Sequence, residues 1–195
     1  MRDQRLNKLV KISVLSAAAF ILMLIEFPLP FFPEFLKVDI SDFPALLGSF
    51  ALGPLAGVII EAVKNILHVL LKNTTAGIGE IANFVVGAAF VFAAGMVYKI
   101  KKDRAHALYG LIAGVVAMAA VAAVCNLFIF LPLYEKVLGF PIPAIVDAGA
   151  KINPAIKDLN TFVALSIVPF NILKGIIVAL LGFLSYKSLS PILHR

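Results

Sequence analysis

Asn171 and Lys174 are the polar residues of this 195-residue chain best placed to do chemistry, because they interrupt a long apolar run. Their spacing of three residues puts them on one face of a helix. The amide offers donors and an acceptor and the ammonium offers three donors, so the pair could read the edge of a ligand with carbonyl and ring-nitrogen acceptors. The alternative is that Lys174 pairs with a carboxylate on another helix.

Two further amides lie at a similar depth in other apolar runs. Asn83 and Asn126, like Asn171, fall in the half of their runs nearest the same end of the predicted bundle. Three amides from three helices would converge on one cavity. The alternative is hydrogen bonding between helices, worth only about 0.6 kcal/mol for each bond.

A second polar stripe consists of Glu61, Lys64, Asn65 and His68, whose spacing puts all four on one helix face. It forms either a self-neutralising seam that orients helices or a set of ligand contacts. The other histidines, His106 and His194, are expected across the membrane. With a single cysteine in the chain, no metal site is expected.

Catalytic motifs are missing from the sequence. There is no phosphate-binding Gly-x-x-x-x-Gly-Lys-Ser/Thr, no His-Glu-x-x-His and no Gly-x-Ser-x-Gly. The chain is therefore not expected to be an enzyme or to hydrolyse ATP by itself. A small intramembrane enzyme remains an alternative, with Glu61 and His68 as its only acid–base candidates.

The composition requires a membrane. Hydrophobic residues make up 62% of the chain and charged residues only 14%, which excludes an ordinary soluble domain and a disordered chain. The net charge of +6 comes from basic residues at the ends of apolar runs, so they indicate membrane topology and not nucleic-acid binding. We expect one integral membrane domain over residues 1–195, located in the cell membrane.

The apolar runs predict six helices in an all-α membrane protein. They cover residues 8–27, 45–52, 54–71, 79–98, 107–131 and 161–186. The second is too short to span a bilayer alone, and Ser41-Asp42-Phe43-Pro44 gives it a helix-start signature, with a capping side chain and a proline in the first turn. The second and third could instead form one kinked span.

The distribution of basic residues favours six helices with both termini cytoplasmic. The inside set is Arg2, Arg5, Lys8, Lys11, Lys99, Lys101, Lys102, Arg104, Lys187 and Arg195, and the outside set is Lys37, Lys72, Lys136, Lys151 and Lys157. Ten against five obeys the positive-inside rule, whereas a single kinked span gives eight against seven.

Two long extracellular loops are predicted, one after the first helix and one over residues 132–160. Such loops are either lids over a site or segments lying on the headgroups. On the first helix, Ser13, Ser16 and Ala17 form a smooth patch that suits a helix partner or packing within the bundle.

These residues together resemble the substrate-binding S component of energy-coupling factor (ECF) vitamin transporters, in particular the riboflavin-binding branch. The resemblance rests on residues 26–30, residues 37–44, Glu61-x-x-Lys64-Asn65, Asn126 and Asn171-x-x-Lys174. It implies that riboflavin, or FMN, binds from outside with its ring held by Asn126, Asn171 and Lys174, while the loop after the first helix covers the site. The further residues expected at the ligand are Lys37, Asp42, Phe43, Glu61 and Asn83.

The same resemblance implies partners but no resident cofactor. A transmembrane coupling protein, EcfT, and two cytoplasmic ATPases would supply the energy. The patch at Ser13, Ser16 and Ala17 matches the position of the family's small-residue motif and would contact the coupling protein. An S component for another vitamin remains the main alternative.

Overall fold

The computed structural model describes residues 2–193, with side chains from residue 5 to residue 186. The side chains of Arg2 and Lys187, and residues His194 and Arg195, therefore lie outside the described part. The elements are α1 (Arg2–Met23), β1 (Phe27–Pro28), β2 (Lys37–Val38), α2 (Asp42–Leu52), α3 (Pro54–Lys72), α4 (Ile78–Ile100), α5 (Arg104–Cys125), η1 (Asn126–Phe130), α6 (Leu131–Leu138), α7 (Ile142–Ala150), α8 (Leu159–Phe162), η2 (Val163–Ile167) and α9 (Val168–Leu193).

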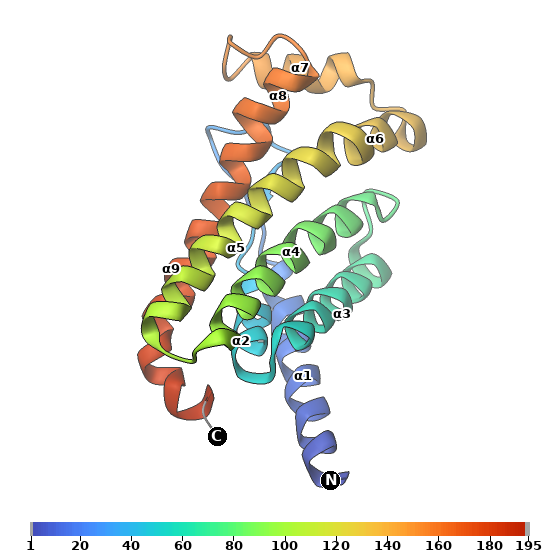
Figure 1. Ribbon diagram of the computed structural model, residues 1–195. Helices are drawn as coiled ribbons and strands as arrows, with labels where there is room; N and C mark the ends of the chain where they lie inside the picture. Colours follow the sequence, from blue (N-terminus) through green and yellow to red (C-terminus); the bar gives the residue numbers. More distant parts are fainter. Residues whose placement is uncertain (1, 194–195) are drawn as a thin grey trace.

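The helices form one elongated bundle with the short helix α2 at its centre (Figure 1). Helix α2 packs against α1, α3, α4 and α9, and its residues Ala45, Leu46 and Phe50 are almost fully buried. Helix α1 begins and α9 ends at one end of the bundle, whereas α6, α7 and α8 lie at the other (Figure 1). The bundle therefore has a terminal end and an opposite end, which is built from the connecting segments.

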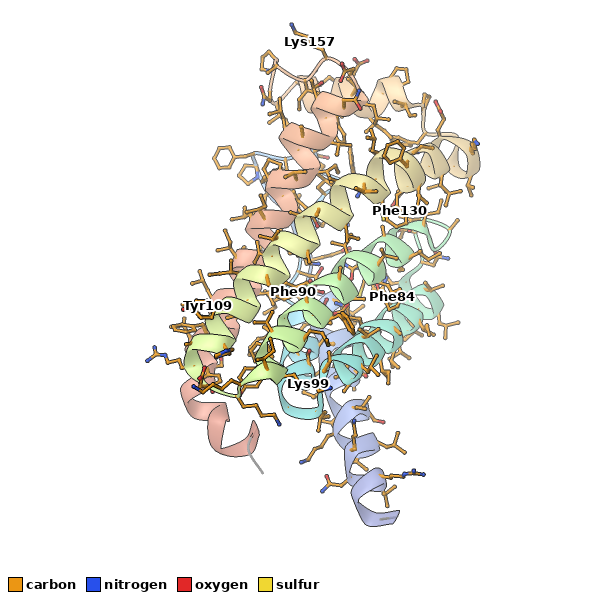
Figure 2. The ribbon with its side chains drawn as sticks, viewed as in Figure 1. Phe84, Phe90, Lys99, Tyr109, Phe130 and Lys157 are labelled. Carbon is orange, nitrogen blue, oxygen red and sulfur yellow. The ribbon has the colours of Figure 1, made fainter. Side chains whose placement is uncertain are left out.

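The described chain is mostly helical, and five of its helical segments are long and apolar enough to cross a membrane. Helix α2, with 11 residues, spans only about 16 Å. Many large apolar side chains remain exposed on the outside of the bundle: Tyr109, for example, lies on the outer surface, whereas Phe90 points inward from α4 (Figure 2). This outward-facing apolar surface is what a lipid environment requires.

The connection after the first helix differs from the expected loop. Helix α1 ends at Met23, four residues earlier than predicted, and Phe27–Pro28 pairs in antiparallel register with Lys37–Val38. Ser41 is not a side-chain cap of α2; its hydroxyl accepts a hydrogen bond from Lys64 instead. The segment is a small hairpin whose following turn is tied to α3.

The prediction that residues 132–160 form a loop is also wrong, because this segment contains most of α6, all of α7 and the start of α8. The fifth helix was expected to end at Leu131, just before Pro132. The helix continues because the π-helical turn η1 immediately before it widens the backbone, which relieves the clash that proline causes. The result is one apolar helical run from Arg104 to Leu138, 35 residues long.

The patch on α1 is divided between two faces. Ser13 and Ala17 are exposed, but Ser16 is only 1% exposed and faces the bundle. Helix α1 packs against α2 and α3, so the surface that it leaves to a partner carries Ser13 and Ala17, whereas Ser16 is covered by the bundle.

Candidate functional site

A cavity of about 480 Å³ lies in the half of the bundle that carries α6 and α7. This volume falls in the range typical of small-molecule sites. Its lining comes from the β1–β2 hairpin, from α4, α5, α6, α7 and α9, and from the two π-helical turns. The cavity is lined by Phe35, Leu36, Lys37, Thr74, Thr75, Gly79, Ala82, Asn83, Val86, Met118, Asn126, Leu131, Tyr134, Leu138, Phe140, Ile145, Ile167, Phe170, Asn171 and Lys174.

The three predicted amides meet at this cavity. Asn126 Nδ2 donates to the carbonyl oxygen of Ala122, and Asn171 Nδ2 donates to that of Ile167, each at 2.8 Å. Each of these amides therefore keeps its oxygen and one N–H free for a ligand. Asn83 Oδ1 is buried without a hydrogen-bond partner in the described structure. The amides thus present both donors and acceptors to the cavity.

Two π-helical turns hold the asparagines on helices α5 and α9. Asn126 begins η1, and Asn171 hydrogen-bonds to Ile167, the last residue of η2. Each turn ends two residues before a proline, Pro132 or Pro169. A wide turn re-aims the side chains that follow it, and such turns are frequent at functional sites. Hydropathy patterns do not reveal this feature.

Lys174 lines the cavity and is also paired with carboxylates. Its ammonium donates to Asp39 Oδ2 at 3.0 Å and lies 3.4 Å from Asp42 Oδ2, beyond a good hydrogen bond. Lys174 therefore has a carboxylate partner on another segment, as one alternative from the sequence proposed, and it also lines the cavity. Its contact with a ligand stays a prediction.

Lys64 belongs to a closed cluster behind the cavity. Its ammonium contacts Asp42 Oδ1, Glu61 Oε2 at 2.8 Å and the Ser41 hydroxyl at 2.7 Å. Helix α4 approaches this cluster closely at Gly87, where a Cβ atom would lie 2.6 Å from Glu61 Oε2. Glu61 and Lys64 of the stripe thus form a self-neutralising seam that joins α3 to α2 at Asp42, whereas His68 pairs with Glu80 of α4.

Three residues expected at the ligand lie away from the cavity wall. Asp42 and Glu61 are fully buried against Lys64, and Phe43 packs against the hydrophobic core. Direct ligand contact from these side chains is therefore not what this structure shows. The spacing of Glu61 and Lys64 allowed for their pairing, but it could not reveal that Lys64 would also contact Asp42 of α2.

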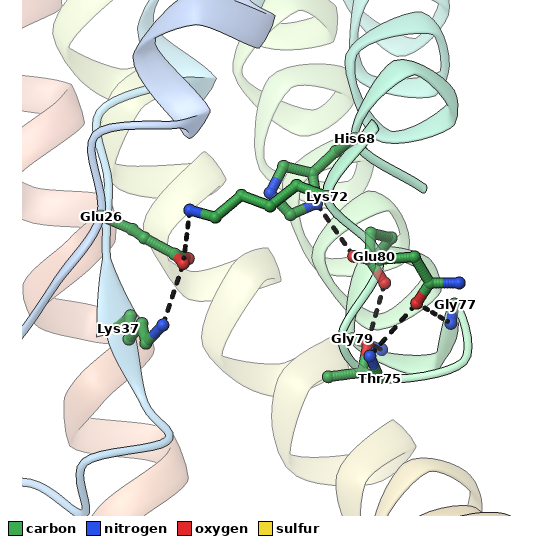
Figure 3. Close-up of polar contacts among 9 residues, drawn as sticks. Glu26, Lys37, His68, Lys72, Thr75, Gly77, Gly79 and Glu80 are labelled. Atoms are coloured by element: carbon green, nitrogen blue, oxygen red, sulfur yellow. Dashed lines mark hydrogen bonds and ion pairs between the residues drawn. The ribbon is translucent and has the colours of Figure 1, made fainter. Parts of the chain in front are cut away.

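The mouth of the cavity carries a second set of polar contacts (Figure 3). Glu26 Oε1 accepts hydrogen bonds from Lys37 at 2.9 Å and from Lys72 at 3.1 Å, which ties the hairpin to the end of α3. Partial burial by itself would raise the pKa of Glu26, but the hydrogen bonds and charges of Lys37 and Lys72 outweigh it and lower that pKa below its ordinary value.

Hydroxyl groups at the mouth were missed by sequence reasoning. Thr75 donates to Glu80 Oε2 at 2.9 Å, and Glu80 Oε1 lies 2.9 Å from His68 Nδ1 (Figure 3). Thr75 and Tyr134 both line the cavity. Threonine and tyrosine are ordinary residues in loops and at membrane interfaces, and only their position at the outer ends of the spans could have pointed to them.

Aromatic contacts close the cavity from the hairpin side. The Phe32 ring packs edge-on against Phe170 of α9 at 5.4 Å between centroids, and Phe35 lies 6.2 Å from Phe162 of α8. Phe35 and Phe170 also line the cavity. The walls are therefore mainly apolar and aromatic with a few convergent polar groups, which is the usual make-up of a small-molecule site. Within the described residues, no cluster of three or more His, Cys, Asp or Glu residues could hold a metal ion.

Comparisons with known proteins agree with one another. Residues 7–186 match the family "ECF transporter, substrate-specific component". The chain is 38% identical to the riboflavin transporter RibU of Staphylococcus aureus (strain TCH60), covering 98% of this chain and 95% of that protein. It is 35% identical to the riboflavin transporter FmnP of Bacillus subtilis (strain 168), covering 96% and 94%.

A solved structure described as the S component of a bacterial ECF transporter has the same fold. It superposes with a TM-score of 0.77 at 37% identity, covering 98% of this chain and 99% of that one. The matches to the two riboflavin transporters and to the solved structure each extend over nearly the whole of both proteins. This chain is an integral membrane protein that belongs to the family of substrate-specific S components of ECF transporters.

Proposed function

We propose that this chain is the riboflavin-binding subunit of an ECF transporter and that the 480 Å³ cavity is its vitamin site. The observation that carries the proposal is the convergence of Asn83, Asn126, Asn171 and Lys174 on one largely apolar cavity. The names of the relatives, riboflavin transporters RibU and FmnP, point to the same vitamin.

The chemistry of the cavity suits a flavin. The isoalloxazine ring is flat, and its polar edge alternates carbonyl oxygens with ring nitrogens, one of which carries a hydrogen. Asn126 and Asn171 each offer one free N–H and one oxygen, and the Lys174 ammonium offers further donors. The hydroxyls of Thr75 and Tyr134 at the mouth suit the hydroxylated ribityl chain.

In the membrane, we infer six crossings with both termini in the cytoplasm and the cavity open to the outside. Support comes from the common end shared by the start of α1 and the end of α9 (Figure 1) and from the basic residues 99–104 at the α4–α5 connection. The cavity lies at the opposite end, toward α6 and α7.

The proposed subunit works with partners and performs no catalysis itself. The coupling protein EcfT and two cytoplasmic ATPases supply the energy, and the exposed residues Ser13 and Ala17 of α1 contact the coupling protein. Helix α1 suits this role because only 22% of its most apolar stretch is buried in the bundle, which leaves most of its surface for lipid or a partner.

A flavin titration of the purified protein tests the proposal. Riboflavin fluorescence should be quenched on binding, because the aromatic walls and amides replace water around the ring. FMN, thiamine, biotin and folate serve as competitors, and a preference for any of the last three would identify a different vitamin. Absence of riboflavin binding at micromolar ligand would refute the proposed function.

A further inference from the structure

Asp39 stands out because nothing in the proposed site assigns it a role, although it is only 5% exposed. Its Oδ2 accepts a hydrogen bond from the Lys174 ammonium at 3.0 Å, and its Oδ1 accepts one from the backbone N–H of Ser41 at 2.8 Å. The carboxylate is therefore fixed from both sides, by the turn that begins α2 and by the lysine on α9.

Each of the two buried lysines pairs with a different set of buried carboxylates. Glu61 and Asp42 Oδ1 contact Lys64, whereas Asp39 contacts Lys174. Asp42 Oδ2 approaches Lys174 only to 3.4 Å. Among the described residues, Asp39 is thus the one hydrogen-bonded acceptor of the Lys174 ammonium, and it fixes where the end of a flexible four-carbon side chain comes to rest.

Asp39 also connects the cavity to the hairpin. It directly follows β2, whose Lys37 lines the cavity and pairs with Glu26. A displacement of the hairpin moves Asp39, and Asp39 moves the ammonium of Lys174. The Asp39–Lys174 ion pair therefore joins the hairpin to α9 beside the aromatic contact of Phe32 with Phe170.

We propose that Asp39 is the positioning residue of the site: it aims the Lys174 ammonium at the flavin edge and couples that contact to the β1–β2 hairpin. The proposal rests on the proposed function. The carbonyl oxygens of a flavin carry only partial charge, so they do not displace a full carboxylate from the ammonium. Asp39 keeps one donor of Lys174, and the ligand uses the others.

The substitution Asp39→Asn separates two roles of Asp39: positioning the Lys174 ammonium and holding the turn at Ser41. Asparagine keeps an oxygen for the Ser41 N–H and tolerates the same turn. It replaces the acceptor facing Lys174 by an NH₂ donor, which repels the ammonium. We expect the riboflavin Kd to rise about tenfold.

A double-mutant cycle with Lys174→Met supplies the readout that a purely structural role would not produce. In the Lys174→Met background, Asp39→Asn should change the riboflavin Kd by less than about twofold, because the group it positions is gone. Asp103→Asn is the matched control: Asp103 caps α5 far from the cavity, and asparagine caps equally well.

Three results would decide the matter. An equal rise in Kd in both backgrounds, or no rise in the unaltered background, would overturn the positioning role while leaving the vitamin assignment intact. Failure of the unaltered chain to bind riboflavin would instead refute the proposed function. If Asp39→Asn does not fold, Asp39→Glu is used in the same cycle, since it keeps the charge but moves it by one methylene.

Discussion

Lys64 and Lys174 are both buried lysines, with 0% and 4% exposure, but they differ in how many polar partners surround each ammonium. The Lys64 ammonium donates hydrogen bonds to Asp42 and Ser41 and forms an ion pair with Glu61. Lys174 has one hydrogen-bonded partner in the described structure and faces a cavity. The comparison teaches that burial of a charge does not by itself mark a binding residue; the donors that remain unused do.

Lys64→Met should have the largest effect, and the effect should be on stability. Removing the ammonium leaves Glu61 buried without its cation and leaves Asp42 with only the Lys174 ammonium at 3.4 Å, at a cost of about 3–5 kcal/mol. Denaturation of the purified protein in detergent measures the loss. The fraction that still folds should bind riboflavin with unchanged affinity, and a stable variant with weakened binding would reverse the roles of the two lysines.

Lys174→Met should act mainly on binding. Loss of a charged donor at the flavin edge should raise the riboflavin Kd about 50-fold, which corresponds to about 2.3 kcal/mol. Fluorescence titration measures it beside Lys64→Met. If the two variants have the same affinity for riboflavin, the distinction between the lysines fails.

Gly87→Ala tests the Lys64 side without touching a charge. The added methyl group would meet Glu61 Oε2 at 2.6 Å, and the resulting overpacking should cost about 1–3 kcal/mol of stability. Gly175→Ala on α9 is the control, because the nearest atoms to its added methyl group, Met118 Sδ and Val115 Cγ2, lie farther away, at 3.2 Å. Equal thermal stability of the two variants would show that the seam around Lys64 has room to adjust.

Asn171→Leu tests the Lys174 side with a neutral residue of similar size. Loss of the hydrogen bonds of this one amide should raise the riboflavin Kd about tenfold. Asn7→Leu, which changes an exposed asparagine of α1, should leave the Kd unaltered. Retention of full affinity in Asn171→Leu would place the flavin edge elsewhere in the cavity.

Glu26→Gln should have the smallest effect, at the hairpin that precedes Asp39. Because the folded-state pKa of Glu26 lies below its ordinary value of 4.5, its contribution to stability is complete above that value and is lost as the pH falls through the folded-state pKa. The exposed pairs are worth less than about 1 kcal/mol. Melting temperatures between about pH 5 and pH 3 should fall more steeply for the unaltered protein than for Glu26→Gln; parallel curves would contradict this.

The long helices were predictable because lipid imposes one simple requirement, an apolar run long enough to cross it. The positions of α3 and α4 agree with the prediction to within two residues at each end. The segments α6 and α7 were missed because Pro132 looked like a terminator, and no pattern announces that a π-helical turn will let the helix continue.

The site was predictable only in part, for a related reason. Polar residues are scarce in the spans, so Asn83, Asn126, Asn171 and Lys174 could be singled out, and the structure brings all four to one cavity; their role in binding stays a prediction. Which carboxylate would pair with which lysine depends on three-dimensional packing. Asp42 was therefore assigned to the ligand, and Asp39 was not singled out.

The continuous helical run from Arg104 to Leu138 has a consequence for how the protein sits in its bilayer. Its 35 residues extend about 52 Å at a rise of about 1.5 Å per residue, whereas the hydrocarbon layer is about 30 Å thick. Tilting absorbs part of this hydrophobic mismatch, and the remainder must emerge from the hydrocarbon. In the proposed orientation the emerging part is α6, whose Tyr134 and Leu138 line the cavity. That orientation would let the proposed vitamin ligand reach the entrance among the lipid headgroups, without dissolving in the hydrocarbon.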